Sequence, residues 1–116
     1  MSAPRPRVAL TLESPERQPD GRGGFVLAWR ALGRLWAELR PVTGAERAAE
    51  AAAESVVRWR IILRAAPVGD PRRPRPDQRL SMGEGAALRC FQIEAVAEAD
   101  ARGRWLMCMA IEETGA

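Results

Sequence analysis

Apolar residues recur at every second position in several short segments of this chain. A period of two is typical of a β-strand that turns one face toward a hydrophobic core. The alternating segments, each expected to form a strand, are residues 7–13, 25–30, 35–40, 55–65, 78–82, 88–98 and 104–113. We expect the second and third of these to be separate strands joined near Ala31–Gly33. The pattern therefore predicts a mainly β protein.

Three stretches between these segments lack the alternation. Residues 14–24 hold two prolines and three glycines, which favours a surface loop. Residues 44–54 are rich in alanine, and Thr43 could form a capping box with Glu46, so a short inserted helix is expected there. Residues 66–77 are rich in proline and arginine, which predicts a long extended loop.

The chain is long enough for one domain, residues 1–116, and too short for a second core. Its first six residues are expected to be flexible. Roughly six or seven short strands with one short inserted helix predict a small β-barrel or β-sandwich. The last two strands are expected to form a hairpin about a turn at residues 100–103. Cys90 and Cys108 do not face each other in that register, so we expect two reduced, buried thiols.

Residue types that many enzyme classes need are missing from the sequence. All 18 basic residues are Arg, and there is no His, Lys, Tyr or Asn. This composition excludes imidazole base catalysis, histidine metal ligands and Schiff-base lysine chemistry. Two cysteines without a histidine cannot complete a standard structural zinc site in one chain. We therefore expect no enzymatic activity, no metal and no cofactor.

The sequence also gives no sign of a membrane partner. The longest apolar run, residues 105–111, is far shorter than the roughly 20 residues that a membrane-spanning helix needs. The N-terminal residues carry positive charge, but no apolar core or cleavage pattern of a secretory signal follows them. The chain is expected to be soluble and to be made inside the cell.

Two groups of arginines each allow two interpretations. Arg58, Arg60 and Arg64 lie on one face of the strand expected at residues 55–65. They could form a merely solvated face, or they could contact phosphates or the acidic side chains of another subunit. The proline-rich loop could be solubilising or disordered, or it could be a docking loop that uses Arg72, Arg73 and Arg75.

An acidic group and four tryptophans also leave alternatives open. Glu46, Glu50 and Glu54 repeat every four residues, so a helix would gather them into one stripe. The stripe could be an exposed helix face, or it could face a surface that must not adhere to DNA. The tryptophans all lie in predicted strands and could build the core. Alternatively, Trp36 could lie on the outer face and pack against a neighbouring subunit.

The order of several short motifs is similar to that of a known family. The motifs are Asp20-x-x-Gly23-Gly24-Phe25, Trp29, Leu35-Trp-Ala-Glu-Leu-Arg-Pro41, Gly44-x-Glu46-Arg47, Arg60–Arg64 and Phe91–Val96. No single motif is specific, but together they cover nearly the whole chain. The series resembles the phage head-tail joining family, also called head closure or stopper proteins. The likeness is greatest to the versions found in alphaproteobacterial prophages and gene transfer agents.

The resemblance implies a small β-barrel subunit of a ring of on the order of six or twelve copies, which could be monomeric alone. The implied partners are portal or adaptor proteins on the capsid side, a tail terminator on the other side, and double-stranded DNA in the central channel. The family's channel-facing region maps onto residues 42–55, so Glu46, Glu50 and Glu54 are the candidate channel-facing residues. The implied location is a virion or gene transfer agent particle assembled in the bacterial cytoplasm.

The leading hypothesis is a non-enzymatic assembly protein that closes the DNA channel of the filled capsid and gives the tail a platform for attachment. In this hypothesis Arg58, Arg60 and Arg64 contact other subunits or DNA, and the arginine-rich loop docks toward the adaptor or tail. The alternative is a stand-alone small β-barrel that binds nucleic acid. Such modules stack bases on exposed aromatic rings, whereas this chain has no Tyr and only two Phe.

Overall fold

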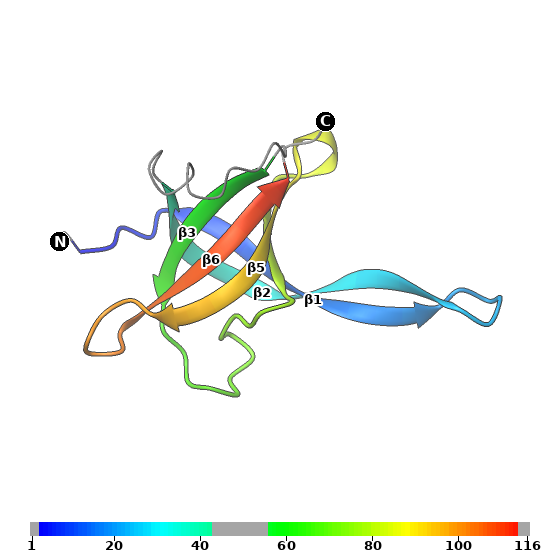
Figure 1. Cartoon of the computed structure of the whole chain (residues 1–116), viewed down its shortest axis with the longest axis horizontal. Helices are drawn as coiled ribbons and strands as arrows, with labels where there is room; N and C mark the ends of the chain where they lie inside the picture. Colours follow the sequence, from blue (N-terminus) through cyan, green and yellow to red (C-terminus); the bar gives the residue numbers. More distant parts are fainter. Residues whose placement is uncertain (1–2, 43–55, 114–116) are drawn as a thin grey trace.

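The computed structural model describes residues 3–42 and 56–113, which form a closed six-stranded barrel (Figure 1). The strands are β1 (Val8–Pro19), β2 (Phe25–Pro41), β3 (Val56–Arg64), β4 (Arg79–Met82), β5 (Arg89–Glu98) and β6 (Trp105–Glu113). Around the barrel they follow the order β1-β2-β3-β6-β5-β4, and every neighbouring pair is antiparallel. The mainly β class is confirmed, and of the two predicted architectures the structure has the barrel.

The alternating apolar residues fill the barrel interior. Leu10 and Leu12 of β1, with Ile61 and Leu63 of β3, are at most 1% exposed. The other buried members of the core are Ala37, Leu80, Phe91, Ile93, Leu106, Cys108 and Ala110. Because successive side chains of a strand point to opposite faces, the residues between them point outward. The alternation of apolar and polar residues along each strand therefore gives the barrel an apolar interior.

Strands β1 and β2 continue beyond the barrel as a two-stranded arm, defined here as residues 13–31 (Figure 1). The prediction of a loop over residues 14–24 was wrong for its first part, because β1 pairs with β2 as far as Pro19 opposite Phe25. Proline cannot donate a ladder hydrogen bond, but it is tolerated on an edge strand. Only the turn is irregular, and there Asp20 accepts hydrogen bonds from the backbone N–H groups of Arg22 and Gly24.

Strand β2 is one continuous strand of 17 residues, so the prediction of two separate strands was also wrong. Leu12 pairs with Gly33 and Glu13 pairs with Ala31, which leaves Leu32 as one extra residue in β2. This is a β-bulge, a feature that bends a ribbon without ending it. Gly33 has φ +154°, a conformation that glycine adopts readily. The glycine signal therefore marks a bulge rather than a turn.

Strands β5 and β6 form the predicted hairpin. Val96 pairs with Cys108 after a bulge, whereas Cys90 pairs with Ser81 of β4. The two thiols are therefore not partners, and both cysteines are free, as the sequence predicts. Cys108 is buried as expected, whereas Cys90 is only partly buried, so its predicted burial was wrong. Burial raises the pKa of Cys108 to about 12, which makes this thiol a poor nucleophile at neutral pH.

The predicted helix at residues 44–54 lies outside the described residues. Among residues 3–42 and 56–113 the only helical element is the short η1 (Gly85–Ala87), and no helix there is long and apolar enough to cross a membrane. Val42 donates its N–H to the carbonyl of Arg58 at 3.1 Å. This contact fixes the chain at the end of the barrel opposite the loop at residues 66–77 (Figure 1).

Two glycines before β5, Gly83 and Gly85, both have a positive φ but differ in the space around them. Gly83 has φ +82°, and a Cβ placed on it would lie 2.3 Å from the carbonyl oxygen of Ala87. Gly83→Ala is expected to lower the free energy of unfolding by more than about 2 kcal/mol, because a positive φ and a backbone clash add. Gly85 also has a positive φ, +56°, but its Cβ would meet nothing within 4 Å. Gly85→Ala is therefore expected to cost only about 1 kcal/mol in urea unfolding, and equal costs would contradict the clash.

Candidate assembly surfaces

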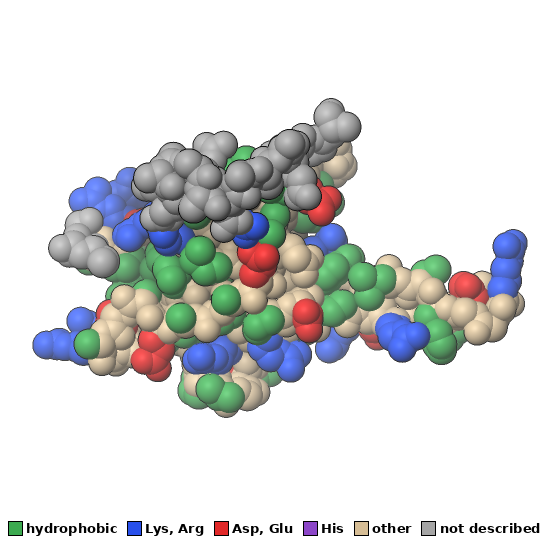
Figure 2. Space-filling model, in the orientation of Figure 1, with side chains coloured by type: hydrophobic (Ala, Val, Ile, Leu, Met, Phe, Trp, Pro, Cys, Tyr) green, Lys and Arg blue, Asp and Glu red, His purple; other side chains and the backbone are tan. Residues whose placement is uncertain are grey.

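The arm has one largely apolar face. Cross-strand partners share a face of a two-stranded ribbon, and the pairs on this face are Pro15–Trp29, Arg17–Leu27 and Pro19–Phe25. Phe25 is 58% exposed and Leu27 is 60% exposed. Figure 2 shows apolar side chains along the arm, outside the barrel. A lone two-stranded hairpin is at best marginally stable in water, and exposed apolar groups gathered in one place mark interaction sites.

The base of the arm is fastened to the barrel by Arg79 of β4. Its Nε donates to Oε1 of Glu13 at 2.6 Å, and its guanidinium lies 4.3 Å from the ring centre of Trp29. The side chains of Arg79 and Glu13 are both mostly buried. Three strands are thus joined where β1 and β2 leave the barrel, which fixes the direction in which the arm projects.

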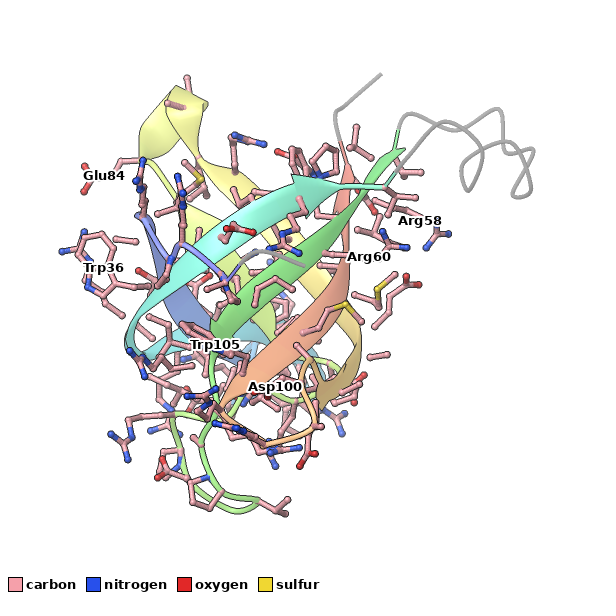
Figure 3. All side chains as sticks on the ribbon, turned by 90° about the vertical axis from the view of Figure 1, so that its left-hand side faces the viewer. Trp36, Arg58, Arg60, Glu84, Asp100 and Trp105 are labelled. Carbon is pink, nitrogen blue, oxygen red and sulfur yellow. The ribbon has the colours of Figure 1, made fainter. Side chains whose placement is uncertain are left out.

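The three arginines of β3 lie on its outer face, as the strand pattern predicts. Arg58 donates to Glu94 of β5 at 2.7 Å, and the guanidinium of Arg64 lies 4.9 Å from the ring centre of Trp105. Arg60 is also engaged in an interaction. Figure 3 shows Arg58 and Arg60 on the side of the molecule away from Trp36. Their contact with another subunit or with DNA stays a prediction.

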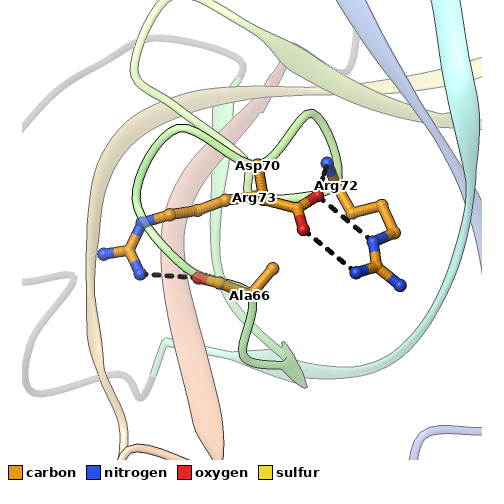
Figure 4. Close-up of polar contacts among 4 residues, drawn as sticks. All are labelled: Ala66, Asp70, Arg72 and Arg73. Atoms are coloured by element: carbon orange, nitrogen blue, oxygen red, sulfur yellow. Dashed lines mark hydrogen bonds and ion pairs between the residues drawn. The ribbon is translucent and has the colours of Figure 1, made fainter.

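The arginines of the loop at residues 66–77 are largely tied to the loop itself (Figure 4). Asp70 accepts from the backbone N–H of Arg72 at 2.8 Å and from its guanidinium at 3.2 and 3.0 Å. The hydrogen bond from the Arg72 side chain lowers the pKa of Asp70. Arg73 donates to the carbonyl of Ala66 at 3.0 Å, and the backbone N–H of Arg75 donates to the Gln78 side chain at 2.8 Å. A docking role for this loop also stays a prediction.

A polar cluster lies at the end of the barrel where β3 begins and β6 ends. Glu112 is 7% exposed, accepts from Nε1 of Trp59 at 3.0 Å, and accepts two hydrogen bonds from Arg89, at 2.6 and 2.9 Å. The Arg89 guanidinium also lies 5.2 Å from the ring centre of Phe91. The hydrogen bond from Arg89 is the main cause that lowers the pKa of Glu112, although burial opposes it.

This cluster predicts a stability that depends on acid pH. A carboxylate with a lowered pKa in the folded state stabilises the protein above the unfolded pKa, near 4.5, and this contribution is lost as the pH falls through the folded pKa. Glu112→Gln is expected to lower the free energy of unfolding at pH 7 by about 1.5 to 3 kcal/mol and to flatten its fall below pH 4.5. Denaturant unfolding at several pH values measures both effects.

The matched control for this prediction is Glu94→Gln. Glu94 makes the exposed ion pair with Arg58, and exposed pairs contribute only about 0 to 1 kcal/mol. A loss of stability in Glu94→Gln as large as that in Glu112→Gln would show that burial of the carboxylate is not the cause.

A groove of about 690 Å³ lies where β2 and β3 separate. Its walls are Arg34–Trp36 of β2, residues 63–66 at the end of β3, Pro6 and Arg72. Trp36 is 61% exposed, and Figure 3 shows it pointing away from the barrel. Of the two interpretations of the tryptophans, the outer-face position therefore holds for Trp36. Trp59 packs against the core.

The candidate channel residues Glu46, Glu50 and Glu54 lie outside the described residues. The arm and the groove are features that the sequence reasoning missed. The alternation of Phe25–Trp29 could have indicated the arm, but the prolines of residues 15–19 concealed the pairing strand. The groove has no sequence signal because its two walls lie about 30 residues apart in the chain. Among the residues that the structure describes there is no group of three potential metal ligands.

Comparison with known proteins identifies the family. A model of phage head completion proteins matches residues 1–113. The chain belongs to the phage head completion protein family. Membership supports a structural role of this head completion protein in head assembly.

Two solved structures are similar to this head completion protein. A chain in the virion of a native gene transfer agent particle is 48% identical, has a TM-score of 0.76, and is matched over 98% of this chain and 100% of that chain. Protein SF1141 from Shigella flexneri 2a, a solution structure, is 24% identical with a TM-score of 0.69 and full coverage of both chains. The second likeness is one of fold alone. A comparison with curated proteins finds no match.

Proposed function

We propose that this head completion protein is a stopper-type subunit of a phage or gene transfer agent particle. In a ring at the head-tail junction it closes the DNA channel of the filled head and offers the tail its platform. The observation that carries the proposal is the 48% identity to a virion chain of a gene transfer agent particle, over nearly the full length of both chains. Identity at that level and coverage supports the same location, in the particle.

The arrangement of the barrel is compatible with a subunit that joins two different neighbours. Val42 and Val56, the described residues on either side of the candidate channel segment at residues 42–55, lie at one end of the barrel, where Val42 bonds to Arg58. The loop at residues 66–77, the candidate docking loop, lies at the opposite end (Figure 1). A subunit with distinct surfaces at its two ends can contact the portal or adaptor on one side and the tail terminator on the other.

The channel segment, residues 42–55, and the basic ridge, defined here as Arg58, Arg60 and Arg64 of β3, receive separate roles in this proposal. Glu46, Glu50 and Glu54 face the channel, where their negative charge keeps passing DNA from adhering. Arg58 and Arg60, on the outer face of β3, contact a neighbouring subunit or the DNA. Arg64 belongs to the same ridge, but it already stacks on Trp105 and lies at the rim of the groove.

Particles made without this protein test the proposal. Deletion of the gene is expected to yield filled heads that lose their DNA and lack tails, and a plasmid copy of the wild-type gene is expected to restore tailed particles. Electron microscopy counts tailed particles, and nuclease digestion of purified heads measures retained DNA. Normal tailed particles from the deletion strain would refute the proposed function.

A further inference from the structure

The structure leaves two apolar features of the same strand uncovered. One is the tip of the arm, where Phe25 and Leu27 are each more than half exposed. The other is the groove beside Trp36. In Figure 1 the arm points to the right, whereas the N-terminal segment and the carboxyl end of β3, which border the groove, lie on the left. The arm therefore cannot reach the groove of its own molecule, whose longest extent is 53 Å.

The groove is shaped to receive an extended strand. Strand β2 pairs with β3 only over Ala37–Pro41, so among the described strands none pairs with Arg34–Trp36 on that side. The backbone there presents hydrogen-bonding groups at the edge of an open slot. Leu35, Leu63 and Ala65 contribute apolar groups to the lining of the groove. A free strand edge above an apolar slot is the geometry of strand addition.

The arm has both an unpaired strand edge and an apolar face. It is a preformed strand pair, and its outer edges beyond Glu13 and before Ala37 have no strand partner among the described residues. Its apolar face can fill the slot, and Phe25 can meet Trp36, since aromatic residues are enriched at the centres of protein interfaces.

The acidic and basic side chains of the arm are balanced in number, so its apolar face rather than its net charge matches the groove. The groove is lined by Arg34, Arg64 and Arg72, and no acidic residue is among its lining residues. The first strand of the arm carries Glu16, and Asp20 stands at its turn. Arg17 of that strand is turned over the ring of Phe25, 4.6 Å from its centre. Glu16 lies 4.0 Å from Arg30 of the second strand, and Arg22 accompanies Asp20 in the turn, so the match to the groove rests on the apolar residues of the arm.

We infer that the arm of one subunit docks in the Trp36 groove of the next copy of the chain. One patch meets a different patch in this contact, so it is heterologous, and repetition closes a ring if the rotation between copies is right. The inference rests on the proposed function, since it supplies the contact that holds such a ring together. A lone two-stranded hairpin is only marginally stable in water, and docking in the groove would pack the arm against a second surface.

Photocrosslinking in assembled particles tests this contact. Phe25→benzoylphenylalanine is expected to crosslink to residues 34–36 or 63–66 of another copy, and denaturing gels are expected to show a ladder of dimers, trimers and higher multiples. Particles assembled from mixed ¹⁵N-labelled and unlabelled copies show by mass spectrometry that the two peptides come from different molecules. Leu88→benzoylphenylalanine, placed at an exposed apolar residue far along the chain, is the control and is expected to give no crosslink to the groove.

The other outcomes separate this inference from the proposed function. Crosslinks from position 25 to a different protein, or a dimer band without higher multiples, would overturn the arm-to-groove contact while the protein remains part of the particle. Absence of the protein from purified particles would instead overturn the proposed function. Phe25→Ser with Leu27→Ser is expected to reduce incorporation into particles at least tenfold with unchanged thermal unfolding of the isolated chain, and normal incorporation would contradict the inference.

Discussion

Phe91→Ala is expected to lower the free energy of unfolding by about 3 to 5 kcal/mol. Phe91 is fully buried at the centre of the barrel, and its ring meets that of Trp59 edge to face, with the ring centres 6.1 Å apart. Truncation leaves a cavity that strands fixed by hydrogen bonds on both sides cannot collapse to fill. At about 4 °C for each kcal/mol in a domain of this size, the midpoint of thermal unfolding should fall by more than about 10 °C.

The chain contains its own control for this experiment. Phe25, the other phenylalanine, is 58% exposed at the arm tip. Phe25→Ala is expected to change the unfolding midpoint by no more than about 2 °C, because little of its surface is buried in the single chain. Calorimetry of both variants measures the difference. Similar losses of stability would show that the arm belongs to the folding core rather than to an assembly surface.

The second large effect concerns the proposed channel segment. Replacement of Glu46, Glu50 and Glu54 together by Arg is expected to reduce DNA delivery by the particle more than tenfold. Three cations in every subunit of a ring would bind the phosphates of passing DNA, and many such contacts add. Because binding of this kind is screened by salt, release of DNA from purified particles should recover as the salt concentration is raised. A transfer assay and triggered release measure the two effects.

The neutral triple variant separates charge from shape in this experiment. Glu46→Gln, Glu50→Gln and Glu54→Gln remove the negative charge at nearly constant volume, so delivery is expected to stay within about threefold of the wild type, since no phosphate-binding cations are introduced. Equal defects in the Arg and Gln variants would mean that the carboxylates are needed for assembly or folding. Normal delivery by the Arg variant would remove these residues from the channel.

The sequence predicts the strands and the buried core well where local patterns decide the structure. Alternating residues such as Leu10, Leu12, Ile61 and Leu63 identify the core, because period two follows from strand geometry alone. The β5–β6 hairpin was predicted nearly in register for the same reason. It also follows that Cys90 and Cys108 stay apart.

Features that depend on distant contacts were not predictable in this way. Pro15 and Pro19 indicate a loop locally, but they lie on an edge strand where their missing N–H groups cost little. Gly33 indicates a turn, but pairing with β1 makes it part of a bulge. The contacts of Arg79 with Glu13 and Trp29 join residues of three strands. Its formation depends on closure of the barrel, which no local pattern specifies.

The most direct test of the central claim is an asymmetric cryo-electron microscopy reconstruction of the purified particle at its head-tail junction. The account predicts a ring of six-stranded barrels around the DNA path, with each arm reaching the adjacent barrel. Density for this chain elsewhere on the capsid, or its absence from tailed particles that retain their DNA, would contradict the account.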